Sequence, residues 1–141
     1  MYRMAILSMC TSDPDLDVSK CVMMALVHDL AEAQVGDIAP REGIPKAEKR
    51  RLEAVTAFIH IHDEYEEGES KEAKFVKDLD RFEMACQASE YERNHGAQTL
   101  QPFFDSSLPF IRHPEVREWG QALYEERSKS RNDDATTSAA K

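Results

Sequence analysis

The sequence of 141 residues has few basic side chains, which excludes some classes of partner. It carries 18 Lys and Arg against 27 Asp and Glu, for a net charge of −9. This balance argues against a nucleic-acid polymer or an anionic membrane surface as partner, because both attract clustered Lys and Arg. If the substrate is a phosphate, we expect a metal ion to supply the attraction that the side chains lack.

Long apolar runs and paired cysteines are also absent. No run reaches the length of about 18 residues that crosses a bilayer, and residues 1–10 lack the basic start and cleavage site of a signal peptide. Cys10, Cys21 and Cys86 are widely spaced and form no Cys-x-x-Cys pair. This pattern predicts buried free thiols in a reducing compartment, not a disulfide scaffold or a zinc site. We therefore expect a cytoplasmic protein with no membrane partner.

Gly-rich loops, internal repeats and alternating strand patterns are missing, and the apolar residues recur at helical spacing. The sequence thus predicts an all-α fold, a single helical domain over residues 1–128. Its first helix begins abruptly without a capping residue, so we expect it to be incomplete. The polar residues 129–141 predict a disordered tail. Helices are expected at residues 1–10, 17–35, 46–62, 70–94 and 114–128, with a turn at 11–17 and a loop that contains Phe103 and Phe104.

An apolar run, residues 21–27, leads directly into His28 and Asp29. A helix that is apolar nearly all round is expected at the centre of the domain, where an unpaired carboxylate is costly. Glu32 falls on the same helical face as His28 and Asp29, and Asp37 follows the helix end. One interpretation is a polar pair whose groups satisfy each other or lie on an exposed stripe. The two additional acids favour the other interpretation, a functional site.

Asp80 is a second unexpected acid. It lies one turn after Val76 and one turn before Met84, on what the pattern predicts to be the core-facing stripe of its helix. Asp78 has basic residues four positions before it and three after it, which predicts a solvated, salt-bridging side chain. Glu83 either joins the site or pairs with a basic side chain. Asp80 is therefore the functional candidate of the three.

One imidazole and several carboxylates make a hard, oxygen-rich ligand set. Such a set suits Mg, Mn, Co or Fe better than tetrahedral structural zinc. A metal ion there would polarise a phosphoryl oxygen and lower the pKa of a bound water, with Glu32 or Asp37 as general base or water-orienting group. The predicted reaction is metal-assisted hydrolysis of a phosphate ester. The other histidines are expected at the surface or as helix caps: His60, His62, His95 and His113.

An ordered series of segments resembles a known family. His28-Asp29 is the dipeptide that names the HD-domain metal phosphohydrolases. Residues 25–32, 35–40 and 73–80 are similar to the 5′-deoxynucleotidase group of that family, as are residues 87–92 and His113-Pro114-Glu115. The dipeptide alone is a weak signal, whereas this series covers nearly the whole chain before the tail and is a strong one.

The resemblance implies an HD-domain helical bundle that removes phosphate from deoxynucleoside 5′-monophosphates with Mn, Co or Mg. It also implies a homodimer. The residue roles that it implies are metal ligands at His28, Asp29 and Asp80, catalytic acids at Glu32 and Asp37, and a possible second-ion site formed by Glu32, Asp37 and the carbonyl of Ile38. No substrate-binding residue is assigned.

The resemblance departs from the family at the start of the chain. The family's first metal-ligand histidine, and an arginine that contributes to substrate recognition in bacterial relatives, would both fall before Met1. We therefore expect an N-terminally truncated chain. The alternative function is a catalytically impaired homologue that binds nucleotide or dimerises with and modulates a partner. A purely structural helical module ranks last, because it leaves the acids near the core unexplained.

Overall fold

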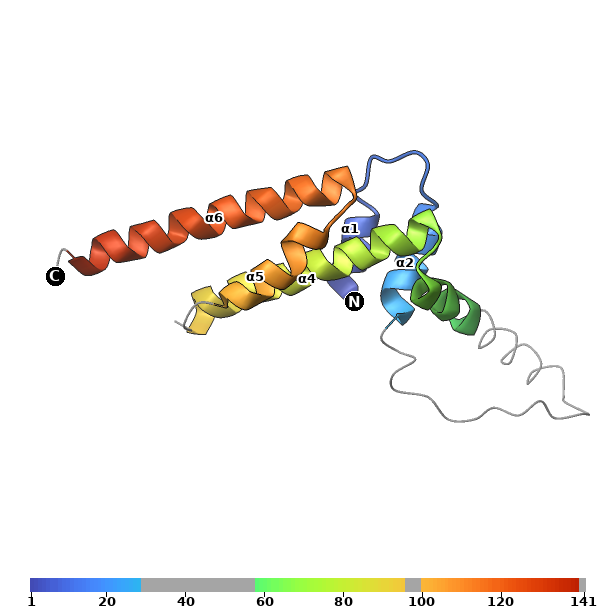
Figure 1. The fold of residues 1–141 in the computed structure, drawn as a ribbon, viewed down its shortest axis with the longest axis horizontal. Helices are drawn as coiled ribbons and strands as arrows, with labels where there is room; N and C mark the ends of the chain where they lie inside the picture. Colours follow the sequence, from blue (N-terminus) through green and yellow to red (C-terminus); the bar gives the residue numbers. More distant parts are fainter. Residues whose placement is uncertain (29–57, 96–99, 140–141) are drawn as a thin grey trace, which may run out of the picture. The chain divides into compact units, whose positions relative to one another are not determined.

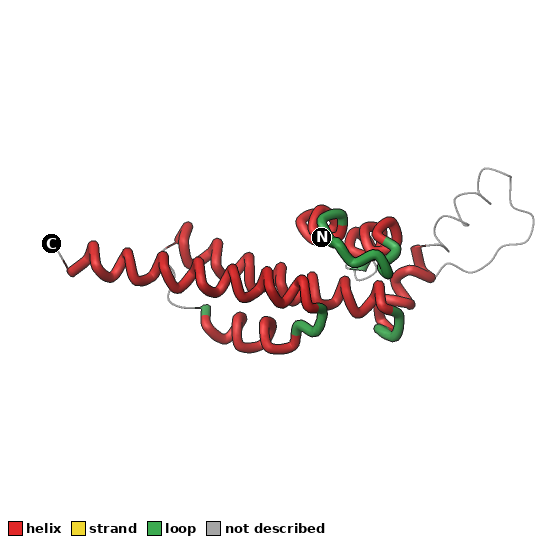
Figure 2. The backbone as a smooth tube through the Cα atoms, turned by 90° about the horizontal axis from the view of Figure 1, so that it is seen from above, coloured by secondary structure: helices red, strands yellow, loops and turns green. Residues whose placement is uncertain are grey.

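The structure is a computed structural model that describes residues 1–28, 58–95 and 100–139, with side chains described as far as residue 130 (Figure 1). Every regular element in these ranges is a helix, and none of the ranges contains a strand (Figure 2). The predicted all-α fold is confirmed. The elements are α1 (Tyr2–Ser8), α2 (Val18–Val27), a helix over residues 58–67, α4 (Lys71–His95), α5 (Gln101–Ser107), the 3-10 helix η2 (Leu108–Phe110) and α6 (Pro114–Ala139).

The chain divides into two compact units, Met1–Lys77 and Asp78–Lys141, and the division falls within α4. The predicted domain over residues 1–128 and its incomplete first helix stay predictions. None of the helices in the described ranges combines the length and the apolarity that a bilayer crossing requires.

Two side-chain oxygens cap helices in the first unit, at positions where the sequence predicts helices to begin. Asp17 is the N-cap of α2 and accepts a hydrogen bond from the backbone N–H of Lys20 at 3.0 Å. Ser70 accepts one from the backbone N–H of Ala73 at 3.1 Å, at the start of α4. Such caps satisfy N–H groups that have no partner inside the helix. The backbone N–H of Asp17 also donates to Glu72, which ties the two helix starts together.

Helix α2 buries one side in the first unit. Cys21, Met24 and Ala25 are fully buried, whereas Met23 and Leu26 on the same helix are 44% and 40% exposed. The expectation that α2 is covered all round is therefore wrong. The physical reason is that the neighbours of α2, among them α1, pack against the side that carries Cys21, Met24 and Ala25, and the side that carries Met23 and Leu26 stays partly exposed.

The three cysteines are free thiols, as predicted. Cys21 and Cys86 are buried, but Cys10 is exposed, so the prediction that all three are buried is wrong for Cys10. Burial raises the pKa of the Cys21 thiol to about 12, with smaller contributions from the charges of Glu72 and Asp17. The thiolate form of Cys21 is therefore strongly disfavoured.

Helix α5 occupies a region that the sequence predicts as a loop. Its seven residues begin with a proline in the first turn and have no side-chain cap. Phe104 is buried to 2% exposure and forms a cluster with Ala85 and Ala88 of α4. So short a helix is held by such packing rather than by intrinsic propensity, which explains why the local sequence does not predict it.

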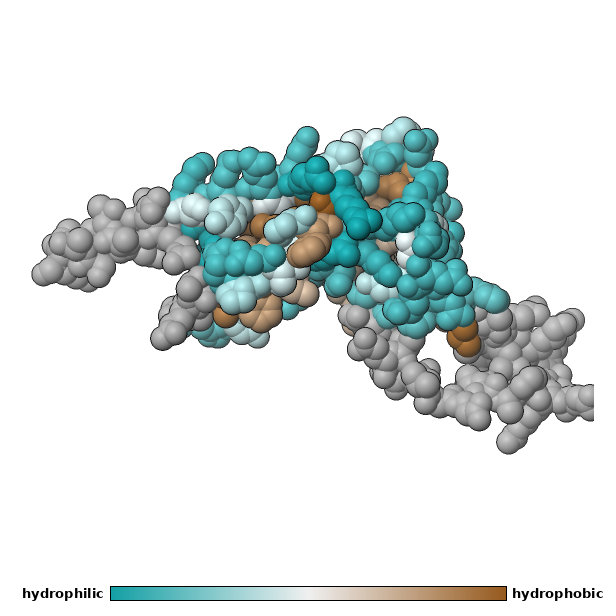
Figure 3. Space-filling view, viewed as in Figure 1, coloured by the Kyte–Doolittle hydropathy of each residue, from teal (hydrophilic) through white to brown (hydrophobic). Residues whose placement is uncertain are grey.

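Arg127 joins three helices of the second unit. Its guanidinium pairs with Glu92 of α4 at 2.7 Å, donates to the side-chain oxygen of Gln101 of α5 at 2.9 Å and lies 3.9 Å from the ring centroid of Phe104. The Glu92 carboxylate also accepts from the backbone N–H of Leu100. These contacts hold α5 against α4 and α6. Apolar side chains nevertheless reach the surface around α5 and η2 (Figure 3), where Phe103 and Phe110 are 47% and 59% exposed.

Helix α6 extends further than the sequence predicts. Its backbone is helical to Ala139, whereas a disordered tail is expected from residue 129. After Gly120 the chain has no glycine or proline to end the helix, and its Ala, Arg, Lys and Glu residues favour helix. The polar composition on which the tail prediction depends is therefore compatible with a continuing helix.

Candidate active site

The structure describes part of the predicted site. Four of its members, Asp29, Glu32, Asp37 and Ile38, lie outside the described residues. His28 belongs to the first unit and Asp80 to the second. Among the described residues, no group of three or more His, Cys, Asp or Glu side chains is placed to hold a metal ion. The assembly of the site thus stays a prediction, and His28 and Asp80 can be assessed one at a time.

His28 lies at the C-cap of α2 and is 5% exposed. Its backbone N–H donates to the carbonyl of Met24, and its side-chain Nδ1 lies 3.0 Å from the carbonyl oxygen of Ala25. A carbonyl oxygen accepts hydrogen bonds only, so Nδ1 must carry the proton. In the neutral ring, Nε2 then carries the lone pair. A backbone carbonyl bound to one ring nitrogen is the usual arrangement around a histidine that ligates a metal through the other.

The ring of His28 packs against a tyrosine that the sequence does not single out. The ring centroids of His28 and Tyr65 lie 5.0 Å apart, with 53° between the ring planes. Tyr65 is 8% exposed and comes from the helix over residues 58–67. No local motif marks Tyr65, because it follows His28 by 37 positions in the sequence.

Asp80 lies on α4 and is partly buried. The prediction that it belongs to the core-facing stripe holds on one side only, since Val76 is fully buried whereas Met84 is 41% exposed. In this part of α4 the buried side is formed by residues such as Leu79 and Phe82. Asp80 therefore lies at the border between the core and the open side of the helix.

Asp78 has a different environment from the predicted one. It is 2% exposed, so the expectation of a solvated side chain is wrong, although the predicted ion pair with Arg81 is present at 2.6 Å. The other carboxylate oxygen accepts hydrogen bonds from the backbone N–H groups of Arg112 and His113, at 2.8 and 2.7 Å. These partners lie 34 and 35 positions away in the sequence, where local spacing gives no signal. Asp78 thus anchors the segment that leads into α6.

Asp80 borders a cavity of about 460 Å³ in the second unit. Glu83 lines the same cavity and accepts a hydrogen bond from the side-chain amide of Gln87 at 3.0 Å. The aromatic rings of Tyr91 and Phe103 line it as well, and both side chains are about half exposed. The cavity therefore places a candidate metal ligand beside aromatic and amide side chains, within the size range of ligand pockets.

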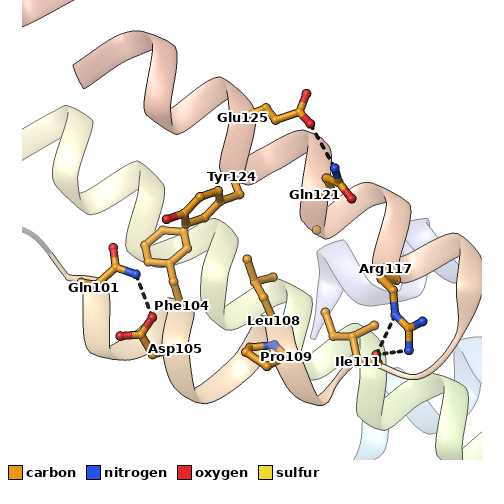
Figure 4. A pocket seen from close by; sticks show the side chains of 11 residues that line it. Gln101, Phe104, Asp105, Leu108, Pro109, Ile111, Arg117, Gln121, Tyr124 and Glu125 are labelled. Atoms are coloured by element: carbon orange, nitrogen blue, oxygen red, sulfur yellow. Dashed lines mark hydrogen bonds between the residues drawn. The ribbon is translucent and has the colours of Figure 1, made fainter. Parts of the chain in front are cut away.

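A second cavity of about 510 Å³ lies between α5, η2 and α6 (Figure 4). Its polar side chains bind one another or the backbone: Gln121 donates to Glu125 at 3.2 Å, and Arg117 donates to the carbonyl of Ile111 at 3.0 Å. Asp80, the predicted site residue of this unit, is not among the residues that line it. The cavity beside Asp80 is consequently the better candidate for a substrate.

The remaining histidines are not among the residues that line either cavity. His60 and His95 are exposed, and the ring of His95 packs near Tyr91 at the end of α4. Nδ1 of His62 lies 3.6 Å from the carboxylate of Asp63, and His113 directly precedes α6. The predicted surface position is confirmed for His60 and His95, whereas His62 and His113 are partly buried and their predicted role stays a prediction.

Comparison with known families tests the resemblance. A family model described as HD domain matches residues 1–59 and 52–117. The chain belongs to the HD-domain family. The human HD-domain relative 5′-deoxynucleotidase HDDC2 is 45% identical over 143 residues, which cover 91% of this chain and 70% of that protein. The Xenopus laevis protein of the same name is 41% identical and covers 98% of this chain and 76% of that protein.

Two solved structures extend the comparison to the fold. The HD domain-containing protein YGK1 superimposes with a TM-score of 0.66 at 30% identity, covering 91% of this chain and 75% of that one. A predicted metal-dependent phosphohydrolase from Magnetospirillum magnetotacticum has a TM-score of 0.59 at 22% identity, which is a likeness of fold alone. The HD-domain fold predicted from the sequence is thus confirmed.

Proposed function

We propose that this HD-domain chain is a metal-dependent 5′-deoxynucleotidase. It would hydrolyse deoxynucleoside 5′-monophosphates to deoxynucleoside and phosphate. The observation that carries the proposal is the extent of the similarity: proteins named 5′-deoxynucleotidase, from human to budding yeast, are 36% to 45% identical over 90% or more of this chain. A likeness spread over nearly the whole chain includes every segment in which the candidate residues lie.

Membership of the HD-domain family indicates a divalent metal ion, and we propose Mn, Co or Mg. The donor set fits a divalent ion of this kind, since it combines one imidazole with carboxylates. When bound, such an ion polarises a phosphoryl oxygen and makes water more acidic. The proposed ligands are His28, Asp29 and Asp80 for a first ion, and Glu32, Asp37 and the Ile38 carbonyl for a second.

The side chains have distinct proposed roles. His28 offers Nε2 because the carbonyl of Ala25 keeps the proton on Nδ1. Glu32 or Asp37 takes a proton from the attacking water and passes it to the departing C5′ oxygen as the bond from that oxygen to phosphorus breaks. The net charge of −9 repels a phosphate, so a bound cation also reduces the electrostatic repulsion that the substrate meets.

The cavity beside Asp80 supports a nucleotide as the substrate. A phosphate held near Asp80 leaves the nucleoside within reach of the rings of Tyr91 and Phe103. Stacking on such a ring contributes about 1–3 kcal/mol per base and is tolerant of base identity. Homodimerisation and a cytoplasmic location, both expected from the sequence, stay predictions.

The decisive experiment is phosphate release by the purified chain from the four deoxynucleoside 5′-monophosphates, with Mn, Co or Mg added. EDTA and the matching 3′-monophosphates serve as controls. We expect release that requires the added metal and the 5′ position. A folded sample that binds the metal but releases no phosphate from any 5′-monophosphate would overturn the proposal in favour of a non-catalytic homologue.

A further inference from the structure

Tyr65 packs directly on the imidazole of His28. The two side chains are 8% and 5% exposed, and their ring centroids are 5.0 Å apart in a tilted arrangement. The contact lies wholly within the first unit. The hydrogen bond to the carbonyl of Ala25 holds Nδ1, and the packing of Tyr65 against the ring adds a contact that restrains the plane of the imidazole.

Tyr65 is itself held in place from within the same unit. The ammonium of Lys77 lies 5.2 Å from the centroid of the Tyr65 ring and donates to the backbone carbonyl of Glu66 at 3.1 Å. A cation over an aromatic face adds a stabilising contact. Lys77 therefore links α4 to the helix that carries Tyr65.

The turn between these helices also fits closely around Lys77. Gly68 has a φ of +66°, in the left-handed region that favours glycine, and its N–H donates to the carbonyl of Glu64 at 3.1 Å. A Cβ at this position would lie 2.8 Å from the Lys77 ammonium. The Gly68 turn thus lies directly beside the Lys77 ammonium, and glycine there leaves space for it.

We propose that Tyr65, backed by Lys77, is a positioning residue that fixes the orientation of the His28 imidazole for metal binding. The inference rests on the proposed function only in assigning a metal to His28. The ring of Tyr65 prevents the imidazole from tilting out of the orientation in which Nδ1 donates to the backbone and Nε2 faces a ligand. Groups that orient a metal-binding histidine typically change metal affinity by about 10- to 100-fold when they are removed.

The first test is metal affinity of the full chain, measured by titration with Mn²⁺ and detection of free Mn²⁺ by electron paramagnetic resonance. Tyr65→Leu removes the ring but keeps an apolar side chain, and we expect it to weaken binding by at least about 10-fold. Tyr65→Phe keeps the ring and should bind within about 2-fold of the unchanged chain. If Tyr65→Leu does not fold, Tyr65→Met replaces it.

A matched control separates positioning from general loss of packing. Phe104→Leu removes a ring that is 2% exposed, that pairs with Tyr124 at 6.4 Å and that does not line the cavity beside Asp80. It should lower the melting temperature without changing Mn²⁺ affinity. Equal weakening of affinity in Phe104→Leu and Tyr65→Leu would overturn the positioning role, as would unchanged affinity in Tyr65→Leu.

The second test needs no metal. Nitrogen chemical shifts of the His28 ring are measured in the metal-free chain, well above the usual imidazole pKa of about 6.5. We expect the Nδ1–H tautomer in the unchanged chain and in Tyr65→Phe, and a mixture of tautomers in Tyr65→Leu. An unchanged tautomer in Tyr65→Leu overturns the inference. If the unchanged chain binds no divalent metal, the proposed function fails, while this measurement still decides the role of Tyr65.

Discussion

Asp78 and Asp80 lie two positions apart on α4, and they differ in their burial and in what they contact. Asp78 is 2% exposed and accepts three hydrogen bonds, from Arg81 and from two backbone N–H groups before α6. Asp80 is partly buried and borders a cavity. The comparison teaches that a fully buried acid held by backbone N–H groups is a structural group, whereas a partly buried acid that lines a cavity is a candidate for chemistry.

The largest expected effect separates the two acids by activity. Asp80→Ala should reduce turnover by about 1000-fold, since a metal ion contributes several kcal/mol to the stabilisation of the transition state. Its melting temperature should stay within about 2 °C of that of the unchanged chain, because substitutions of side chains outside the packed core change stability little. Phosphate release, bound metal and thermal unfolding are measured on the same preparation. Full metal content and full rate in Asp80→Ala would remove Asp80 from the site.

The reverse result is expected for Asp78. Asp78→Ala leaves two backbone N–H groups and Arg81 without their acceptor and should destabilise the fold by about 3 kcal/mol. Chemical denaturation measures this loss, and Asp78→Asn, which keeps one acceptor oxygen, should lose less. The folded fraction of either variant should retain metal. Normal stability with lost metal binding in Asp78→Ala would reverse the two assignments.

A smaller effect is expected for Phe103, which lines the same cavity as Asp80. Phe103→Ala should raise KM for a deoxynucleoside monophosphate by about 10-fold, which corresponds to about 1.4 kcal/mol of lost stacking. Phe110→Ala is the matched control, since Phe110 is 59% exposed and borders neither cavity. Equal KM values for the two variants would show that the nucleoside does not contact Phe103.

The smallest expected effect concerns Glu64, a carboxylate in the first unit. Glu64 lies 2.6 Å from the ammonium of Lys20, and its pKa is lowered chiefly by that hydrogen bond and next by one from Ser70. A lowered folded-state pKa means that this stabilisation is present above the unfolded pKa of about 4.5 and is lost as the pH falls through the folded value. Glu64→Gln should therefore flatten the fall in unfolding free energy on acidification while costing under about 1 kcal/mol at neutral pH. An unchanged acid limb would contradict this.

Local signals in the sequence predict much of the fold. Asp17, Ser70 and Pro114 each mark a helix start because their effect depends on groups within one turn. Helix α5 is not predicted, since it depends on the burial of Phe104 against α4. The distinction is one of range: contacts within four residues leave a pattern in the sequence, and contacts between elements do not.

The candidate site follows the same rule. His28 and Asp80 are identified as acids or bases in unusual apolar settings, which is a local property. The burial of Asp78 and the packing of Tyr65 on His28 depend on residues more than 30 positions away, and no spacing reveals them. The roles of Asp29, Glu32 and Asp37 rest on the sequence and the family.

The unequal burial of the three cysteines makes the chain ready for site-selective labelling. Cys10 lies exposed just after α1, while Cys21 and Cys86 are buried and the Cys21 thiol has a pKa of about 12. A maleimide reagent should therefore attach at Cys10 in the unmutated protein. Cys10 belongs to the same unit as His28. A nitroxide there would report a nearby paramagnetic ion such as Mn²⁺ through the broadening of its own spectrum, without any engineered attachment point.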